Sequence, residues 1–237
     1  MAIVNMEGLH LGSPAPGFSG ELEFSGTGAS GNTEKYDLAA GTRLQWHQQK
    51  TTDFLLLDYR YGRVAGDTNT DKSFAHFRHI YETGPNLAWE VFVQAEQNEF
   101  TRMEFRGLGG AGARFGLGDK SPASARYLGV GAFYVSETLT KVPGLTDDGT
   151  ERLWRANAYF VIKYKISDHA GFVSSTYYQP SLKDSGDYRL LETASLAVEI
   201  TGKLLLKLSI EIVHDNEPPQ AVESTDTSYR TGISYIF

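Results

Sequence analysis

The chain has 237 residues, a formal net charge of -7 at pH 7 and a hydrophobic content of 41%. The acidic balance argues against a nucleic-acid partner, because phosphate binding needs basic patches. The absence of cysteine excludes disulfides, thiolate nucleophiles and cysteine-ligated metals. The sequence has no run of about 18 apolar residues, so it has no transmembrane helix.

Residues 1–16 are predicted to form a short N-terminal segment, followed by one domain over residues 17–237. The opening stretch MAIVNMEGLHLG has neither the basic start nor the long apolar core of a signal peptide. The chain is therefore either cytosolic, or exported with its signal peptide already removed.

Side chains alternate between apolar and polar at every second position through most of the chain, which predicts strands. About twelve such segments begin near residues 18, 34, 52, 73, 87, 102, 124, 152, 170, 190, 204 and 227. Each covers roughly 10 to 14 residues, longer than the ordinary strand of about five or six. Tilted strands of about 9 to 11 residues are long enough to cross a bilayer.

The connections between these segments alternate in length. The tight ones are HQQKTT, ETGPN, GDKSPAS, ISDHAG and ITGKL, and the longer, mostly acidic ones are VAGDTNTDKS, TKVPGLTDDGTE, PSLKDSGDYR and HDNEPPQAVESTDT. Outer-membrane barrels have short periplasmic turns, longer external loops and an even number of strands. The sequence therefore predicts an all-β fold: a transmembrane, antiparallel, up-and-down β-barrel of about twelve strands with both termini periplasmic.

Aromatic residues on the predicted outward face fall into two groups, as expected for the two interfaces of a bilayer. The group at the turn end is Phe18, Trp46, Tyr81, Trp89, Tyr164, Tyr235 and Phe237. The group at the loop end is Tyr36, Tyr59, Tyr61, Tyr134, Trp154, Tyr178 and Tyr229. A water-soluble sandwich or lipocalin-like barrel is the alternative, and it predicts the reverse arrangement, with apolar residues inside.

The chain ends in TGISYIF, with apolar side chains at alternate positions up to the last residue. This ending resembles the C-terminal targeting signal that the insertion machinery reads in bacterial outer-membrane proteins. The residues that carry the resemblance are Tyr229, Ile233, Tyr235 and Phe237. We therefore expect export, removal of a signal peptide and insertion into the bacterial outer membrane.

The stretch GFSGELEFSGTGASGNTEKYDLAAGTRLQW, followed by DFLLLDYRYG and SFAHFRHIYE, resembles the salt-induced outer-membrane protein family. The most characteristic parts are Gly17, Ser19 and Gly20 in the first strand and Ser30, Gly31, Asn32 and Thr33 in the first hairpin. The resemblance covers nearly the whole chain and implies an outer-membrane barrel. It implies no established activity.

Three motifs were weighed as chemical sites. GLGGAG, residues 107–112, matches a dinucleotide loop but opens no helix, so Gly110 and Gly112 are expected to face the lumen and to leave space or permit strong bending. DTNTD, residues 67–71, resembles half a calcium loop and is expected to be an external hairpin loop. His79 is expected to face lipid, where catalysis needs a neighbouring lipid-facing serine that the sequence does not offer.

The inward face of the predicted strands carries charges of both signs in near balance. The expected lumen residues are Glu21, Glu23, Asp37, Arg43, Asp58, Arg60, His76, Arg78, Glu90, Glu96, Glu104, Arg106, Arg114, Arg155, Lys163, Lys165, Glu199, Lys207, Glu211 and Arg230. Phe92, Tyr127, Phe133 and Tyr159 are also expected to point inward and to narrow the lumen. The charges fit either a polar passage or a ladder of ion pairs that stiffens a closed barrel.

The sequence thus favours a narrow passive channel for small polar solutes or ions. The alternative is a closed barrel with a structural, envelope-stress or binding role, and a lipid-modifying enzyme is disfavoured because its triad is missing. We expect no catalytic activity, no cofactor and no protein-bound metal. The expected partners are outer-membrane lipid, lipopolysaccharide bridged to the acidic loops by divalent cations, and the insertion machinery.

Overall fold

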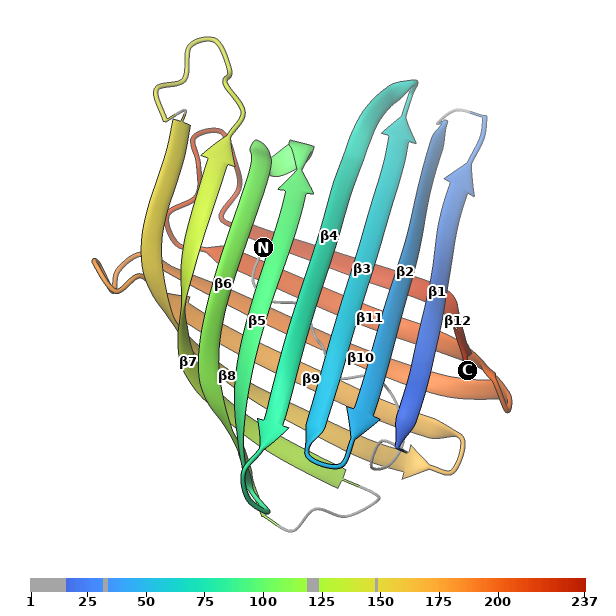
Figure 1. Ribbon diagram of the computed structural model, residues 1–237. Helices are drawn as coiled ribbons and strands as arrows, with labels where there is room; N and C mark the ends of the chain where they lie inside the picture. The colour runs from blue at the N-terminus through green and yellow to red at the C-terminus, as the bar shows by residue number, and fades with distance from the viewer. Residues whose placement is uncertain (1–15, 32–33, 119–123, 148) are drawn as a thin grey trace.

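The computed structural model describes residues 16–31, 34–118, 124–147 and 149–237. It forms a closed antiparallel barrel in which consecutive strands pair as neighbours and β12 returns to β1 (Figure 1). The predicted all-β, up-and-down barrel is therefore confirmed. Apart from Pro16, the expected N-terminal segment 1–16 lies outside the described residues.

The strands are long enough to cross a bilayer at a tilt, from 11 residues in β9 to 19 in β8. Their bounds are β1 Gly17–Ala29, β2 Lys35–Gln48, β3 Thr51–Val64, β4 Asp67–Glu82, β5 Leu87–Asn98, β6 Met103–Gly116, β7 Ser124–Leu139, β8 Gly149–Ser167, β9 Ala170–Pro180, β10 Tyr188–Thr201, β11 Leu204–Asp215 and β12 Thr225–Ile236. A single 3-10 turn, η1 Glu99–Thr101, joins β5 to β6. No helix in the described part of the chain is long and apolar enough to span a membrane.

One connection differs from its prediction. Residues 67–71, expected to be an external loop, form the first part of β4. The turn that precedes them consists of Ala65 and Gly66, both with positive φ, at 51° and 91°. Positive φ at both central residues matches the twist of a two-residue hairpin, so the strands continue right up to this turn.

The barrel has the reverse polarity of a water-soluble protein. Val93 and Trp89, on the outward face of β5, are each 56% exposed. On the inward face, Arg106 is 1% exposed and Glu90 2%. An outer wall of apolar side chains around a charged interior is stable in lipid and not in water. The alternative of a water-soluble sandwich or lipocalin-like barrel is therefore wrong.

The outward aromatic residues lie where the alternation placed them. All members of the two expected groups are exposed except Tyr61, whose ring packs against that of Tyr36 at a centroid distance of 6.2 Å. At the turn end, Tyr235 and Phe18 flank Phe237, each with its ring centroid 6.2 Å from that of Phe237. The chain therefore ends in an aromatic patch on the outer wall.

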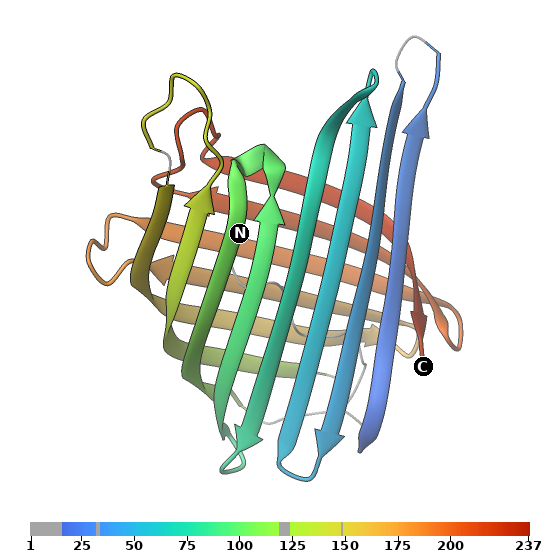
Figure 2. The same cartoon turned by 45° about the horizontal axis from the view of Figure 1, so that its top comes forward.

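The last residue also closes the barrel. The backbone amides of Gly20 and Phe237 each donate to the other's carbonyl, at 2.9 and 3.0 Å. The Phe237 ring lies directly over Gly20, in the space that a side chain there would occupy. From this point β1 and β12 pair only from Glu21 to Phe24, and then diverge toward the loop end (Figures 1 and 2).

A lipid-facing position at mid-depth provides a test of the strand register. Val93 lies midway along the outward face of β5, between Trp89 at the turn end and Gln97 near the loop end. Val93→Arg should destabilise the barrel by about 2–4 kcal/mol, because it places a cation near the bilayer midplane. Urea unfolding in lipid vesicles measures this cost. Gln97→Arg, nearer the interface on the same strand, should cost about 0–1 kcal/mol, and equal costs for both would contradict the register.

Candidate functional site: the barrel lumen

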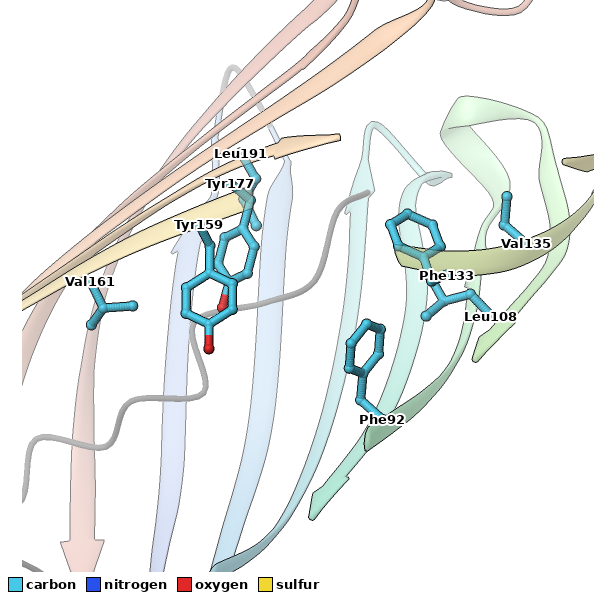
Figure 3. Close-up of a cluster of buried hydrophobic side chains, with 8 residues drawn as sticks. All are labelled: Phe92, Leu108, Phe133, Val135, Tyr159, Val161, Tyr177 and Leu191. Carbon is cyan, nitrogen blue, oxygen red and sulfur yellow. The ribbon is translucent and has the colours of Figure 1, made fainter. Parts of the chain in front are cut away.

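The lumen has an apolar half and a charged half. The apolar half is a cluster contributed by β5 to β10: Phe92, Leu108, Phe133, Val135, Tyr159, Val161, Tyr177 and Leu191 (Figure 3). All eight side chains are at most 7% exposed. Phe92, Phe133 and Tyr159 point inward as expected, and they fill this side of the barrel with rings.

Glycines on β6 and β7 make room for these rings. A Cβ on Gly110 would lie 2.5 Å from the Phe133 Cβ and 2.7 Å from the Phe92 ring. A Cβ on Gly129 would overlap the Tyr159 ring. The GLGGAG motif is therefore part of strand β6, and its inward glycine Gly110 accommodates the aromatic cluster.

Arg78 links the apolar cluster to the charged residues. Its guanidinium lies 3.2 Å from the Glu90 carboxylate and stacks over the rings of Phe92 and Tyr159, with centroids at 5.4 and 5.5 Å. The Tyr159 hydroxyl donates to the same carboxylate at 2.8 Å. A buried charge needs a nearby opposite charge and hydrogen bonds, and Glu90 supplies both.

The charged half contains an unbroken series of ion pairs in which the sign alternates at every step. It begins with Arg43 to Glu21 at 2.6 Å, Glu21 to Lys207 at 3.1 Å, Lys207 to Glu23 at 2.6 Å and Glu23 to Arg230 at 3.6 Å. It continues with Arg230 to Asp58 at 3.5 Å, Asp58 to Arg60 at 2.8 Å, Arg60 to Glu211 at 3.3 Å and Glu211 to Lys72 at 3.8 Å. We call these nine residues the ion chain.

The ion chain joins the two ends of the sequence across the β1–β12 seam, on six consecutive strands of the wall. Its members come from β1 to β4 and from β11 and β12, and Lys207 is 186 residues away from its partner Glu21. The signs nearly cancel, because five bases face four acids. The chain therefore offers polar contacts to either sign of solute without a strong net field.

All nine members of the ion chain line a cavity of about 100 Å³, which is room for several waters. A second cavity of about 410 Å³ lies toward the loop end, lined by residues of β3, β4, β5, η1, β11, β12 and the β11–β12 loop. The two cavities share Arg60, Lys72, Glu211 and Ser228 in their walls. The charged half of the lumen is thus hollow and polar, while the apolar half is filled.

A second set of ion pairs lies beside the apolar cluster. The Arg106 guanidinium is 3.1 Å from Glu137, which also accepts a hydrogen bond from Arg189 at 2.9 Å. Arg189 in turn pairs with Asp215 at 2.7 Å. This set lies on β6, β7, β10 and β11 and lines neither cavity described above.

Three connections at the loop end are held together by one arginine. Arg102, which follows η1 with a φ of 57°, bonds to Asp147 at 2.8 Å and to the Gln220 carbonyl at 2.9 Å. The Gln220 amide donates to Asp147 at 2.6 Å. The hydrogen bond from Arg102 lowers the pKa of Asp147, so the contact persists at pH values where an ordinary aspartate is protonated.

The structure places all but one of the expected lumen residues on the inward face, buried or half-buried. Glu104 is the exception and is exposed. A bulge between Met103 and Phe105 shifts the register, so that Met103 takes the buried position. Bulges insert an extra residue and redirect the side chains beside them, which an alternating pattern does not anticipate.

Three expected lumen residues sit near the turn end, away from the ion chain. Lys165 pairs with Asp168 in the β8–β9 turn at 2.6 Å, and Glu199 pairs with His169 in the same turn at 3.2 Å. Lys163 is half-buried on the inward face of β8. These groups border the periphery of the lumen at that end.

Sequence reasoning missed several polar residues of the lumen. Lys72 and Arg189 were assigned to loops because turn-type residues precede them. The inward residues Gln45, Glu137 and Gln179 were also missed. Gln45 lies two residues from Arg43 and Glu137 four residues from Phe133, and this even spacing is the signal that places each on the inward face of its strand.

His79 lies on the outward face as expected, and its partner is an aspartate. Its ring nitrogen Nδ1 is 2.7 Å from Asp53, with about a third of each side chain exposed, 38% and 36%. Its cross-strand neighbour on β5 is Val91. The described outward neighbours supply an acid but no serine.

The barrel resembles bacterial outer-membrane proteins of known structure. The NanC porin has a TM-score of 0.54 and 10% identity, over 92% of this chain and 98% of that one. The translocator domain of the autotransporter NalP from Neisseria meningitidis has a TM-score of 0.54 and 14% identity, over 94% and 90%. An outer-membrane channel from Pseudomonas putida F1 has a TM-score of 0.54 and 11% identity, over 96% and 97%. Identities this low show a shared fold.

The fold and its inverted polarity therefore define a bacterial outer-membrane β-barrel. The chain belongs to the family described as "Protein of unknown function, DUF481", whose model matches residues 22–237. This agrees with the family of unknown activity that the first strands suggested. A comparison with curated proteins found no match.

Close packing of backbone against backbone gives one stability prediction. In Gly131→Ala, the new Cβ would lie 2.7 Å from the Gly112 Cα and overlap the Ala111 carbonyl oxygen. We expect a loss of about 1–3 kcal/mol, measured by urea unfolding in detergent micelles. Gly109→Ala, whose Cβ meets nothing closer than 3.7 Å, is the control and should be near neutral. Equal effects would show that β6 and β7 are less closely packed than described.

The buried ion pair between Arg78 and Glu90 gives a second stability prediction. Glu90→Gln should destabilise the barrel by about 3–5 kcal/mol, because it leaves the guanidinium buried without a counter-charge. Asp37→Asn, in a pair 3.1 Å apart whose Lys35 side chain is 46% exposed, should cost less than about 1 kcal/mol. Unfolding midpoints of the two variants in the same detergent test the contrast. A small effect of Glu90→Gln would show that water reaches Arg78.

Proposed function

We propose that the barrel is a narrow passive channel for small polar solutes or ions. The observation that carries the proposal is the pair of polar cavities that share the ion-chain members Arg60, Lys72 and Glu211. A solute entering at the loop end would meet the larger cavity first and the ion chain next.

The near balance of charge supports weak ion selectivity. Each carboxylate of the ion chain lies between two bases, and each base except the terminal Arg43 and Lys72 lies between two carboxylates. When a solute displaces one partner of an ion pair, the other neighbour of the same sign still compensates the remaining charge. The passage would therefore exchange hydrogen bonds rather than bind tightly.

A closed barrel is the second candidate, and the apolar cluster favours it. Phe133 and Leu191 are fully buried in the lumen at 0% exposure, so the side chains around them leave no solvent contact at this part of the interior. A barrel of twelve strands lies between small filled barrels and wide open ones. In this case the ion chain would stiffen the wall, and the role would be structural or related to envelope stress.

The remaining expectations belong to the same proposal. The barrel would sit in the outer membrane after removal of a signal peptide, with both termini in the periplasm, and Phe237 would be read by the insertion machinery. Its acidic loops would contact lipopolysaccharide through divalent cations. The resemblance to salt-induced outer-membrane proteins adds that its abundance rises with external salt. No catalytic step and no cofactor are proposed.

Single-channel recording in a planar bilayer under a salt gradient tests the channel. Lys72→Gln should shift the reversal potential toward cation selectivity, and Glu211→Gln toward anion selectivity. One unit charge at about 4 Å in water is worth about 1 kcal/mol, so each permeability ratio should change by up to about fivefold. Lys35→Gln, on the exposed end of β2, is the control and should change little.

The outcomes separate the two candidates. Discrete current steps with opposite shifts for the two variants would establish the passage through the ion chain. A folded but silent wild-type barrel would reject the channel in favour of the closed form. Steps that neither variant alters would place the passage elsewhere in the lumen.

A further inference from the structure

The seam between β1 and β12 is paired over only part of its length. Register partners across it run from Glu21 with Ile236 to Phe24 with Ile233. Among the described residues, 25–29 of β1 and 225–232 of β12 have no register partner across the seam, although Gly232 still lies against Phe24 and Ser25. On their other sides both stretches are fully paired, with β2 and β11. The two strands are therefore ordered edges that separate toward the loop end (Figure 1).

This separation lies within the bilayer on the side of the loops. Gly28 of β1 is opposite the interfacial Tyr36 of β2, and Tyr229 of β12 is 79% exposed on the outer wall. The strand segments between these residues and Phe24 would therefore face lipid. Backbone polar groups without a partner in hydrocarbon cost several kcal/mol each, so a polar group from outside the wall must satisfy them.

The two edges are chemically suited to a polar occupant. Residues 25–29 read SGTGA and residues 225–232 read TDTSYRTG, so small and hydroxyl-bearing side chains dominate. The wall next to the paired part of the seam is apolar, with Phe24 61% and Ile233 49% exposed. A polar opening bordered by an apolar wall fits an amphiphile, with its headgroup in the opening and its chains along the wall.

The charged cavity reaches this opening. Arg230 on β12 and Glu23 on β1 both line the cavity of about 100 Å³. Arg230 is held less closely than the other arginines of the ion chain, at 3.6 Å from Glu23 and 3.5 Å from Asp58, compared with 2.6 Å for Arg43 to Glu21. Among the five bases of the ion chain, Arg230 has the most exposed side chain, at 21%. A phosphate that displaces one of these two carboxylates can bind the guanidinium with two parallel hydrogen bonds, while the displaced carboxylate keeps its other base, Lys207 for Glu23 or Arg60 for Asp58.

From these observations we propose that the loop-end part of the β1–β12 seam, where the two strands are unpaired, is a lateral entrance for a phosphate-bearing membrane lipid. The lipid's phosphate reaches Arg230, its acyl chains remain in the bilayer against Phe24 and Ile233, and its polar groups satisfy the strand edges. The entrance opens sideways into the same cavity that the proposed channel uses, but lipid binding there does not require that solutes pass along the barrel axis.

A disulfide lock tests the entrance, because the chain contains no cysteine. The pairing of Phe24 with Ile233, continued along the strands, places Ala29 opposite Ser228. In Ala29→Cys/Ser228→Cys, oxidation would close the seam and reduction would reopen it. Val213→Cys/Asp226→Cys is the matched control, because these residues already face each other on the paired β11 and β12.

The probe is a lysophosphatidylcholine with a photoreactive headgroup, in phosphatidylcholine vesicles. We expect it to label the β12 segment around Arg230 in the reduced lock variant. Labelling should fall by at least about tenfold on oxidation, return on reduction, and stay constant in the control pair. Equal labelling in the oxidised and reduced lock would overturn the proposal. Axial current recorded from the same oxidised sample reports on the channel independently.

If the disulfide of the lock variant does not form, a second variant tests whether Arg230 binds the lipid phosphate. Arg230→Gln should reduce labelling by the phosphate probe about tenfold, because a charge-assisted contact is lost. Labelling by a photoreactive alkyl maltoside, which has no phosphate, should change little. Loss of both labels, or of neither, would show that Arg230 does not bind the phosphate.

Discussion

Backbone amides and carbonyls within a bilayer need hydrogen-bond partners, and this constraint shapes the whole molecule. A closed ring of strands satisfies it everywhere except along the loop-end part of the β1–β12 seam, since each strand supplies the partners of its neighbours. Closure turns one face of every strand toward lipid and the other toward the lumen. The apolar outer wall, the charged interior and the exposed aromatic rings all follow from that single division.

The interior then has to accommodate many charged side chains in a small volume. The structure does so by placing aromatic rings on one side of the lumen and charged side chains on the other. Rings from β5 to β9 pack against glycines on β6 and β7, while the ion chain alternates sign along the opposite wall. Removing a charge from the ion chain would leave its neighbours partly compensated, whereas the Arg78–Glu90 pair has no such reserve. The two halves should therefore tolerate substitution differently, and the hollow half is where a solute could pass.

Strand alternation predicted most of the fold and of the inward face, because the two-residue period fixes a side chain's direction without knowledge of its neighbours. Trp89, Glu90 and Val91 are oriented by their order alone. The pattern failed where the backbone departs from the period, at the bulge near Glu104 and at the Ala65–Gly66 turn that lengthens β4. It also could not predict contacts such as Lys207 with Glu21 or Arg189 with Glu137. These join strands that are not hydrogen-bonded neighbours, with β12 between β11 and β1 and two strands between β7 and β10, so they depend on the curvature of the barrel wall.

The contact between Gly20 and Phe237 has a consequence for the order of assembly. It joins residues near opposite ends of the chain, and contacts with such long sequence separation are the slowest to form because they close the largest loop. Every other strand pair is sequential and can form as a local hairpin. A growing sheet would thus present two open edges until the final residue arrives. Completion of the barrel is therefore one late event that depends on the Gly20–Phe237 contact and the short β1–β12 pairing beside it, and a sheet that has not closed would present two edges exposed to aggregation.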